Sequence, residues 1–148
     1  MQENVMLKEN VCLKVQAKDW RDAMRKSGEL LVSSGFITEE YIDLTIQCVE
    51  ELGPYIVIAP GIALSHSRPH SSVLKTGLSL ITLKEPVSFH CENDPVDVII
   101  TLAAVDDNAH IDKIQIIGEF FSDDDNLERL RNAKSAEDAA AMINSVEV

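Results

Sequence analysis

Apolar residues recur at helical spacing in two stretches of the N-terminal half, which predicts two amphipathic helices. Asp19 is a suitable N-cap for the first helix, which is expected to run to about Ser34 before Gly35 stops it. Thr38, followed by two glutamates, is expected to start the second helix, because acidic side chains stabilise a helix N-terminus. Gly53 and the proline after it are expected to end this helix.

Short apolar runs separated by turn residues predict β-strands. These runs cover residues 11–15, 55–58, 62–64, 76–83 and 96–105. The last run is almost unbroken, which is typical of a strand buried on both faces of a sheet. Polar residues from Ser67 to about Leu74 are expected to form a loop after the third run.

A third amphipathic helix is expected after Asp106, which begins a run of capping residues. Its expected apolar stripe consists of Ile111, Ile114, Ile117, Gly118 and Phe121. Two more helices are expected around 124–131 and 136–144, the second with Ser135 at the capping position. Helices, then strands, then helices favour an α/β fold, in which a mixed β-sheet is flanked by helices on both faces.

The length of 148 residues, with 45% apolar residues, fits one domain with its own core. We find no internal repeat or linker-like tract, so a single domain is expected over 1–148, with its core at about 11–143. No apolar stretch approaches the ~20 residues that a membrane helix needs. The N-terminal segment MQENVMLKEN lacks the apolar region of a secretory signal, so a cytoplasmic location is expected.

The formal net charge of −12 argues against nucleic acids and anionic membranes as partners, because both are bound through basic patches. An acidic balance mainly supports solubility. If the negative charge has a functional role, it favours binding to a basic protein partner.

The three cysteines, Cys12, Cys48 and Cys91, lie far apart in the chain. Their spacing indicates neither a disulfide framework nor a cysteine zinc site. Cys12 and Cys48 fall in apolar patterns and are expected to be buried thiols, whereas Cys91 is expected to be exposed in a polar loop.

Two of the four histidines follow predicted strands, where ligands gather in α/β proteins. His66 follows the apolar run 62–64 after one serine; a neutral imidazole there is a nucleophile that can hold a phosphoryl group. His110 falls in the first turn of the third helix, where its ring is placed to donate a hydrogen bond to a phosphoryl group. Arg68 is a candidate partner for phosphoryl oxygens.

Plainer interpretations stand beside these. His66 also fits an ordinary surface histidine, and His110 fits a helix-start residue bonded to a neighbouring carboxylate. His70 and His90 are expected to be exposed to solvent. A zinc site of His66, His70 and His110 is the metal alternative, but Pro69 opposes the regular helix that would align the first two, and we expect no metal.

Serine chemistry is also weakly indicated. Ser65 and Ser67 flank His66, but neighbouring residues point in different directions and no G-x-S-x-G elbow is present. The chain has no P-loop and no G-x-G-x-x-G motif, so nucleotide binding is unsupported, and no cofactor is expected.

Four segments together resemble one protein family: GPYIVIAPGIALSH (53–66), KTGLSLITLKEP (75–86), NDPVDV (93–98), and LAAVD (102–106) with His110. The family is enzyme IIA of the bacterial phosphoenolpyruvate-dependent sugar phosphotransferase system, in its mannitol–fructose class. The likeness covers Val11 to Ile143 and is strongest to the ascorbate-specific branch. It implies a mixed sheet flanked by helices.

The resemblance also implies a function and its residues. His66 would accept a phosphoryl group from the histidine-containing phosphocarrier protein and pass it to a cysteine of the cognate enzyme IIB. His110 would support that group, with Arg68, Ser67 and Ser65 as candidate binding residues. The membrane enzyme IIC would be engaged only indirectly, and a homodimer is compatible with the sequence.

Two departures from the family pattern stand out. Ser65 replaces the proline that commonly precedes the histidine, which frees the backbone there. The upstream helix carries Glu50 and Glu51 where mannitol-type members have an arginine, so Arg68 or Lys75 would have to supply positive charge. The missing arginine supports the ascorbate-like branch over the mannitol one. Both departures support a second hypothesis, a regulatory binding module without efficient phosphotransfer.

Overall fold

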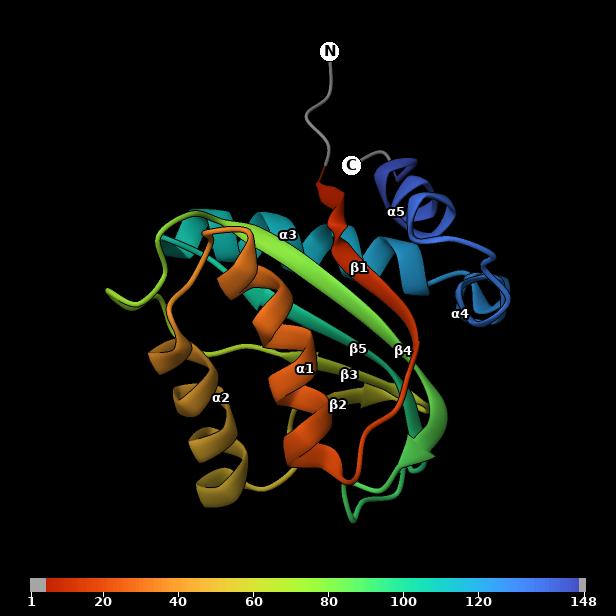
Figure 1. The fold of residues 1–148 in the computed structure, drawn as a ribbon, viewed down its shortest axis with the longest axis horizontal. Helices are drawn as coiled ribbons and strands as arrows, with labels where there is room; N and C mark the ends of the chain where they lie inside the picture. Colours follow the sequence, from red (N-terminus) through yellow and green to blue (C-terminus); the bar gives the residue numbers. More distant parts are fainter. Residues whose placement is uncertain (1–4, 147–148) are drawn as a thin grey trace.

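A mixed β-sheet forms the middle layer of the protein, seen in a computed structural model that describes residues 5–146 (Figure 1). The strands of this range are β1 (Met6–Val15), β2 (Val57–Ala59), β3 (Ile62–Ser65), β4 (Gly77–Val87) and β5 (Val96–Ala103). They lie in the order β1-β4-β5-β3-β2. β1 is parallel to β4 and β3 to β5, whereas β4–β5 and β2–β3 are antiparallel. The carboxyl ends of β3 and β5 therefore share one edge of the sheet.

Helices cover both faces of this sheet. One face carries α1 (Trp20–Ser33) and α2 (Glu39–Leu52). The other carries α3 (Asp107–Phe121), α4 (Asp124–Arg131) and α5 (Ala136–Asn144), as Figure 1 shows. None of these helices is both long and apolar enough to cross a membrane. The expected α/β fold, a mixed sheet between two helical layers, is confirmed.

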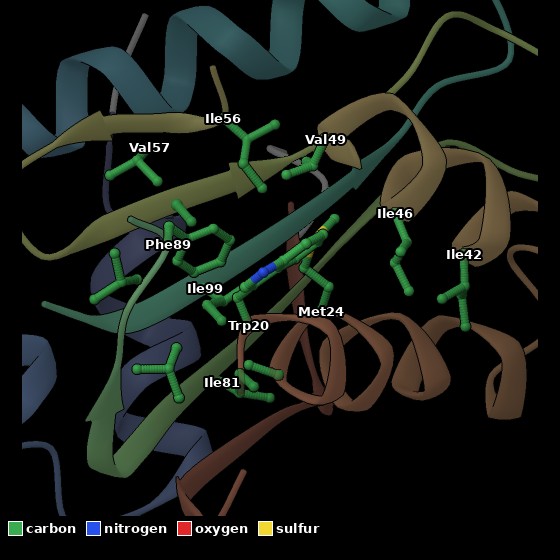
Figure 2. Packing of buried hydrophobic residues seen from close by; sticks show 14 of the residues in the cluster. Trp20, Met24, Ile42, Ile46, Val49, Ile56, Val57, Ile81, Phe89 and Ile99 are labelled. Atoms are coloured by element: carbon green, nitrogen blue, oxygen red, sulfur yellow. The ribbon is translucent and has the colours of Figure 1, made fainter. Parts of the chain in front are cut away.

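Alternate residues of β5 divide the interior into two apolar cores, because neighbouring residues of a strand face opposite ways. Ile99 lies in the core under α1 and α2, where Trp20, Met24 and Phe89 pack around it (Figure 2). Ile100, in contrast, lies in the core under α3 and α5. Each fully buried side chain of this size contributes about 1.5–3 kcal/mol relative to exposure.

Three of the predicted helix caps form as expected. Asp19 accepts a hydrogen bond from the Asp22 N–H at 2.9 Å, and Asp106 accepts one from the Ala109 N–H at 2.8 Å. The Ser135 hydroxyl caps α5 at 3.1 Å. Each cap stabilises its helix by about 1 kcal/mol, so these helix starts are determined locally.

The strand ends differ from the predicted ones. The strand predicted at 55–58 begins only at Val57. Tyr55 lies in a turn, and its N–H donates a hydrogen bond to the Gly53 carbonyl at 2.8 Å. β1 begins earlier than the run 11–15, and β4 extends beyond 83 to Val87. β5 ends before Val105, which is exposed.

Of the apolar stripe predicted for α3, only Ile117 is fully buried. Ile111 and Ile114 are 53% and 37% exposed, Gly118 is exposed, and Phe121 is half-buried, whereas the neighbouring Phe120 is buried. The reason is tertiary: the residues of α3 that join the core belong to its second half, which packs with α4, α5 and the sheet. The first half stands free at the sheet edge where β5 ends, and its isoleucines face solvent.

The predicted cysteine environments are also corrected. Cys12 is exposed on the edge strand β1, although its neighbour Val11 is buried, and Cys48 is only half-buried. Cys91 is half-buried rather than exposed, since it packs against the core under α1 and α2.

Candidate active site

His66 stands directly after β3, which is paired on both sides by β2 and β5. Its ring Nδ1 lies 2.7 Å from the Leu64 carbonyl oxygen. A carbonyl only accepts hydrogen bonds, so Nδ1 carries the proton in this contact. The imidazole is thereby set in the tautomer whose Nε2 has a free lone pair, which is the nucleophilic nitrogen.

His110 lies in the first turn of α3, immediately beyond the end of β5. Its ring centroid is 5.6 Å from that of His66, with the two rings tilted by 59°. Burial lowers the pKa of His110, and the neighbouring His66 lowers it further, whereas Asp107 acts in the opposite sense. His110 is therefore neutral near pH 7 and retains one N–H donor.

An open pocket of about 420 Å³ surrounds the two histidines. Its lining consists of Cys48, Leu52, Tyr55, His66, Ser67, Arg68, Pro69, Asp107 and His110. The structure thus brings together His66, His110, Ser67 and Arg68 from the residues singled out in the sequence. They converge because α3 begins at the edge of the sheet where β3 ends. A nucleophilic nitrogen, a neutral imidazole donor and a guanidinium around an open pocket can accommodate a tetrahedral anion.

Other candidates lie outside the pocket lining. Ser65 is the last residue of β3, pairs with Thr101 and is only 1% exposed, so it belongs to the sheet interior. Lys75 is exposed and lies over the Phe36 ring, 5.5 Å from its centroid. Arg68 is therefore the only arginine or lysine that lines the pocket among residues 5–146.

The two glutamates of the upstream helix also point elsewhere. Glu50 forms an ion pair with Arg21 at 2.9 Å, and Glu51 accepts a hydrogen bond from Gln47 at 3.0 Å. Neither lines the pocket. The residues of α2 that reach the pocket are Cys48 and Leu52, one helical face away.

Tyr55 is a pocket residue that sequence reasoning missed. Its hydroxyl donates a hydrogen bond to the His66 carbonyl at 3.2 Å, and the two rings meet edge-on with centroids 5.6 Å apart. Burial raises the pKa of Tyr55 to about 12, so it remains a phenol and keeps its donor. The periodicity carried no signal for it, because Tyr55 reaches His66 only through the β2–β3 hairpin.

A second missed tyrosine lies beneath the same segment. The Tyr41 hydroxyl accepts a hydrogen bond from the Ser67 N–H at 3.0 Å, although Tyr41 belongs to the first turn of α2. A tyrosine beside an apolar helical stripe is read as core, and this one is 1% exposed. Its polar contact is invisible without the tertiary structure.

The zinc alternative gains no support from the geometry. Among residues 5–146 no three histidine, cysteine or acidic side chains gather as metal ligands. His70 and His90 are exposed, as predicted. The His70 Nδ1 is 2.8 Å from the Ser72 hydroxyl and accepts the Ser72 N–H at 3.0 Å, so it braces its own loop.

Comparison with known proteins gives a consistent result. Residues 4–146 match the family model "Phosphoenolpyruvate-dependent sugar phosphotransferase system, EIIA 2". The chain is 38% identical over 146 residues to the ascorbate-specific PTS system EIIA component of Escherichia coli strain K12, across 97% of this chain and 94% of the relative. Its fold resembles that of the mannitol-specific cryptic phosphotransferase enzyme IIA CmtB from Escherichia coli, with a TM-score of 0.86, 33% identity and coverage of 96% and 97%. A further match is to the Escherichia coli complex of enzyme IIAMTL and phosphorylated enzyme IIBMTL, with a TM-score of 0.76, 28% identity and coverage of 91% and 94%.

Proposed function

Because this chain belongs to the EIIA 2 family of the phosphoenolpyruvate-dependent sugar phosphotransferase system, we propose that His66 is the residue on which it carries its phosphoryl group. As an EIIA component the protein is a phosphocarrier that works through a phosphohistidine intermediate. The observation that supports His66 is its 2.7 Å contact from Nδ1 to the Leu64 carbonyl, within the pocket described above.

The chemistry at His66 is an in-line displacement at phosphorus. The Nε2 lone pair forms the new P–N bond, while the bond from phosphorus to the donor's imidazole nitrogen breaks and its electron pair stays with the donor. His66 keeps the proton on Nδ1, and the Leu64 carbonyl stabilises the positive charge that the ring then acquires. No proton needs to leave the ring, so a general base is unnecessary.

The remaining pocket residues would orient the phosphoryl group. The neutral His110 ring would donate a hydrogen bond to a phosphoryl oxygen, and Arg68 would supply the positive charge. Ser67 would add a hydroxyl donor from the same loop. Ser65 has no such place in our proposal, because it is buried in β3.

The histidine-containing phosphocarrier protein would be the donor, and an enzyme IIB of the ascorbate type the acceptor. In the onward step a cysteine thiolate of enzyme IIB attacks phosphorus, and the P–N bond electrons return to the His66 Nε2. The membrane enzyme IIC would be reached only through enzyme IIB. We place this relay in the cytoplasm, in keeping with the EIIA components to which the chain is similar. An ascorbate substrate rests on the likeness to ascorbate-specific relatives.

A contact face for these partners is formed by exposed apolar residues around the pocket: Leu52, Tyr55, Ile111 and Ile114. Leu52 and Tyr55 line the pocket, and the two isoleucines extend from His110 along α3. Donor and acceptor must each reach the same Nε2, so both would use this face in turn. The net charge of −12 suits partners with a basic rim, which speeds encounter more than it tightens binding.

Ile111→Ser tests this contact face. Ile111 is 53% exposed, so its replacement should leave the fold intact, but it removes an apolar anchor beside His110. We expect the KM for the phosphorylated donor to rise about tenfold, an effect of about 1.4 kcal/mol, with little change in kcat. Ile58→Ser is the matched control, since Ile58 is 46% exposed on the edge strand β2 and does not line the pocket. Equal kinetics for the two variants would contradict the proposed face.

The direct test of the function is phosphorylation of the purified chain. Incubation with phosphoenolpyruvate, enzyme I and the phosphocarrier protein should add one phosphoryl group to the intact mass. Mild acid should remove it, because P–N bonds are acid-labile. If a positive control is labelled and this chain is not, the regulatory binding module becomes the better hypothesis. Ser65 and the missing upstream arginine are the features that would then explain the loss.

A further inference from the structure

Tyr41 lies under the His66 loop but outside the pocket lining. Its side chain is 1% exposed, and its hydroxyl contacts two separate parts of the chain. It lies 2.9 Å from the Leu102 carbonyl of β5 and 3.0 Å from the Ser67 nitrogen. A phenol has one proton to donate, and the Leu102 carbonyl at 2.9 Å is a nearer acceptor than the Ser67 carbonyl at 3.3 Å. The hydroxyl therefore donates to Leu102 and accepts from the Ser67 N–H.

The Tyr41 hydroxyl lies at the point where the pairing of β3 with β5 ends. β3 and β5 are parallel, and their last registered pair is Ser65 with Thr101. In this register the next ladder bond would run from the Ser67 N–H to the Leu102 carbonyl. The Tyr41 hydroxyl stands between those two groups and bonds both. It therefore ends the β3–β5 ladder at Ser65 and holds the following segment away from β5.

The segment held away is the peptide unit that joins His66 to Ser67. Its N–H, on Ser67, donates to the Tyr41 hydroxyl at 3.0 Å, and its carbonyl, on His66, accepts from the Tyr55 hydroxyl at 3.2 Å. The same peptide plane is thus bonded at both ends by a tyrosine. Rotation of this plane would break both bonds and release the Tyr55 ring, which packs edge-on against the imidazole with centroids 5.6 Å apart.

Both tyrosines are suited to a fixed role. Burial raises the pKa of each, so each keeps its hydroxyl proton near pH 7. Tyr41 is anchored by its place in the core between α2 and the sheet. Buried and satisfied hydrogen bonds of this kind specify one geometry, because an alternative geometry leaves a buried polar group unpaired.

We propose that Tyr41 is a positioning residue for phosphoryl transfer: its hydroxyl, inserted between β3 and β5, sets the His66–Ser67 peptide so that the imidazole faces the pocket. This role rests on the proposed function of His66.

Tyr41→Phe tests the proposal, since it removes one oxygen and keeps the ring in the core. The Ser67 N–H and the Leu102 carbonyl then lose their common partner, and the peptide plane shifts. We expect the rate of phosphoryl acceptance to fall about tenfold to a hundredfold, the cost of a misplaced reactive group, while the final extent of labelling is unchanged. In the unphosphorylated variant the Ser67 amide should exchange faster, and the imidazole ¹⁵N signals of His66 should move.

The matched control is Thr45→Val, which deletes a buried hydroxyl one turn further along α2. That hydroxyl bonds only the Ile42 carbonyl of its own helix. Equal rates and unmoved His66 signals in Tyr41→Phe and Thr45→Val would overturn the positioning role. If the wild-type chain takes no phosphate, the proposed function fails, but the His66 signals still test the positioning.

Should Tyr41→Phe fail to fold, Tyr55→Phe tests the same peptide plane from its other end. The side chain of Tyr55 is 42% exposed, so this variant should remain folded. A shift of the His66 imidazole signals together with slower phosphoryl acceptance supports the positioning of this peptide by the two tyrosines, and unchanged signals and rates overturn it.

Discussion

His66→Ala should abolish phosphorylation of the chain by the phosphocarrier protein. The variant removes the imidazole whose Nδ1–H bonds the Leu64 carbonyl and whose Nε2 has the free lone pair. The other imidazole of the pocket lining, that of His110, has no such bond among the described residues, and its pKa is lowered, chiefly by burial. We expect the rate to drop at least about a thousandfold, a barrier increase of about 4 kcal/mol. Intact mass spectrometry would then show no added phosphoryl group.

The control for this variant is His90→Asn. His90 is exposed in the loop between β4 and β5, at the opposite end of the sheet from the pocket. It has a φ of 60°, which asparagine tolerates better than alanine does. Full labelling of His90→Asn together with no labelling of His66→Ala assigns the site. Labelling of His66→Ala at a normal rate would move the assignment to another residue.

His110→Ala should leave phosphorylation possible but slow it in both directions. The neutral ring of His110, 5.6 Å from that of His66, would donate to the phosphoryl group as charge develops on it. Loss of one donor to developing charge costs about 100- to 1,000-fold in rate. Rapid-mixing measurements of uptake from the donor and of transfer to enzyme IIB would detect this change.

Gln115→Ala is the control, because Gln115 is an exposed residue of the same helix. Rates in His110→Ala equal to those of this control would make His110 a structural residue.

The titration of His110 offers a second measurement of the same role. In the resting protein burial and the adjacent His66 disfavour the charged ring, so its pKa lies below the ordinary value. A phosphoryl group on His66 places negative charge beside the ring, which favours imidazolium. The pKa of His110 should therefore rise on phosphorylation, and NMR titration of both forms should show the upward shift. An unchanged pKa of His110 would contradict a position of its ring beside the phosphoryl group.

Local signals in the sequence were sufficient to predict the helix starts and the approximate positions of the strands. Caps such as Asp19 and Asp106 mark their helices because their side chains bond amides within the next three residues. Apolar runs predicted the strands, and His66 and His110 were each expected just beyond one of them. Each of these features depends on neighbours close in the chain, which is why one sequence was sufficient to predict them.

The tertiary structure alone decided which side chains meet at that edge. Ile111 and Ile114 follow the same helical spacing as Ile117, but the core covers only the second half of α3. Periodicity records which residues share a face, whereas the neighbour that covers each part of this face is set by packing. The first half of the stripe therefore became the proposed contact face.

The environment of His66 depends on packing to the same extent. Tyr41 contacts the Ser67 amide across 26 positions of sequence, and Tyr55 reaches the His66 carbonyl across a hairpin. Ser65 is adjacent to His66 in the chain, but its side chain is buried and does not line the pocket. The sequence suggested His66 as the nucleophile from its place after a predicted strand and from the family resemblance. The direction of its ring depends on hydrogen bonds between distant segments, which have no local pattern and form only when the chain is folded.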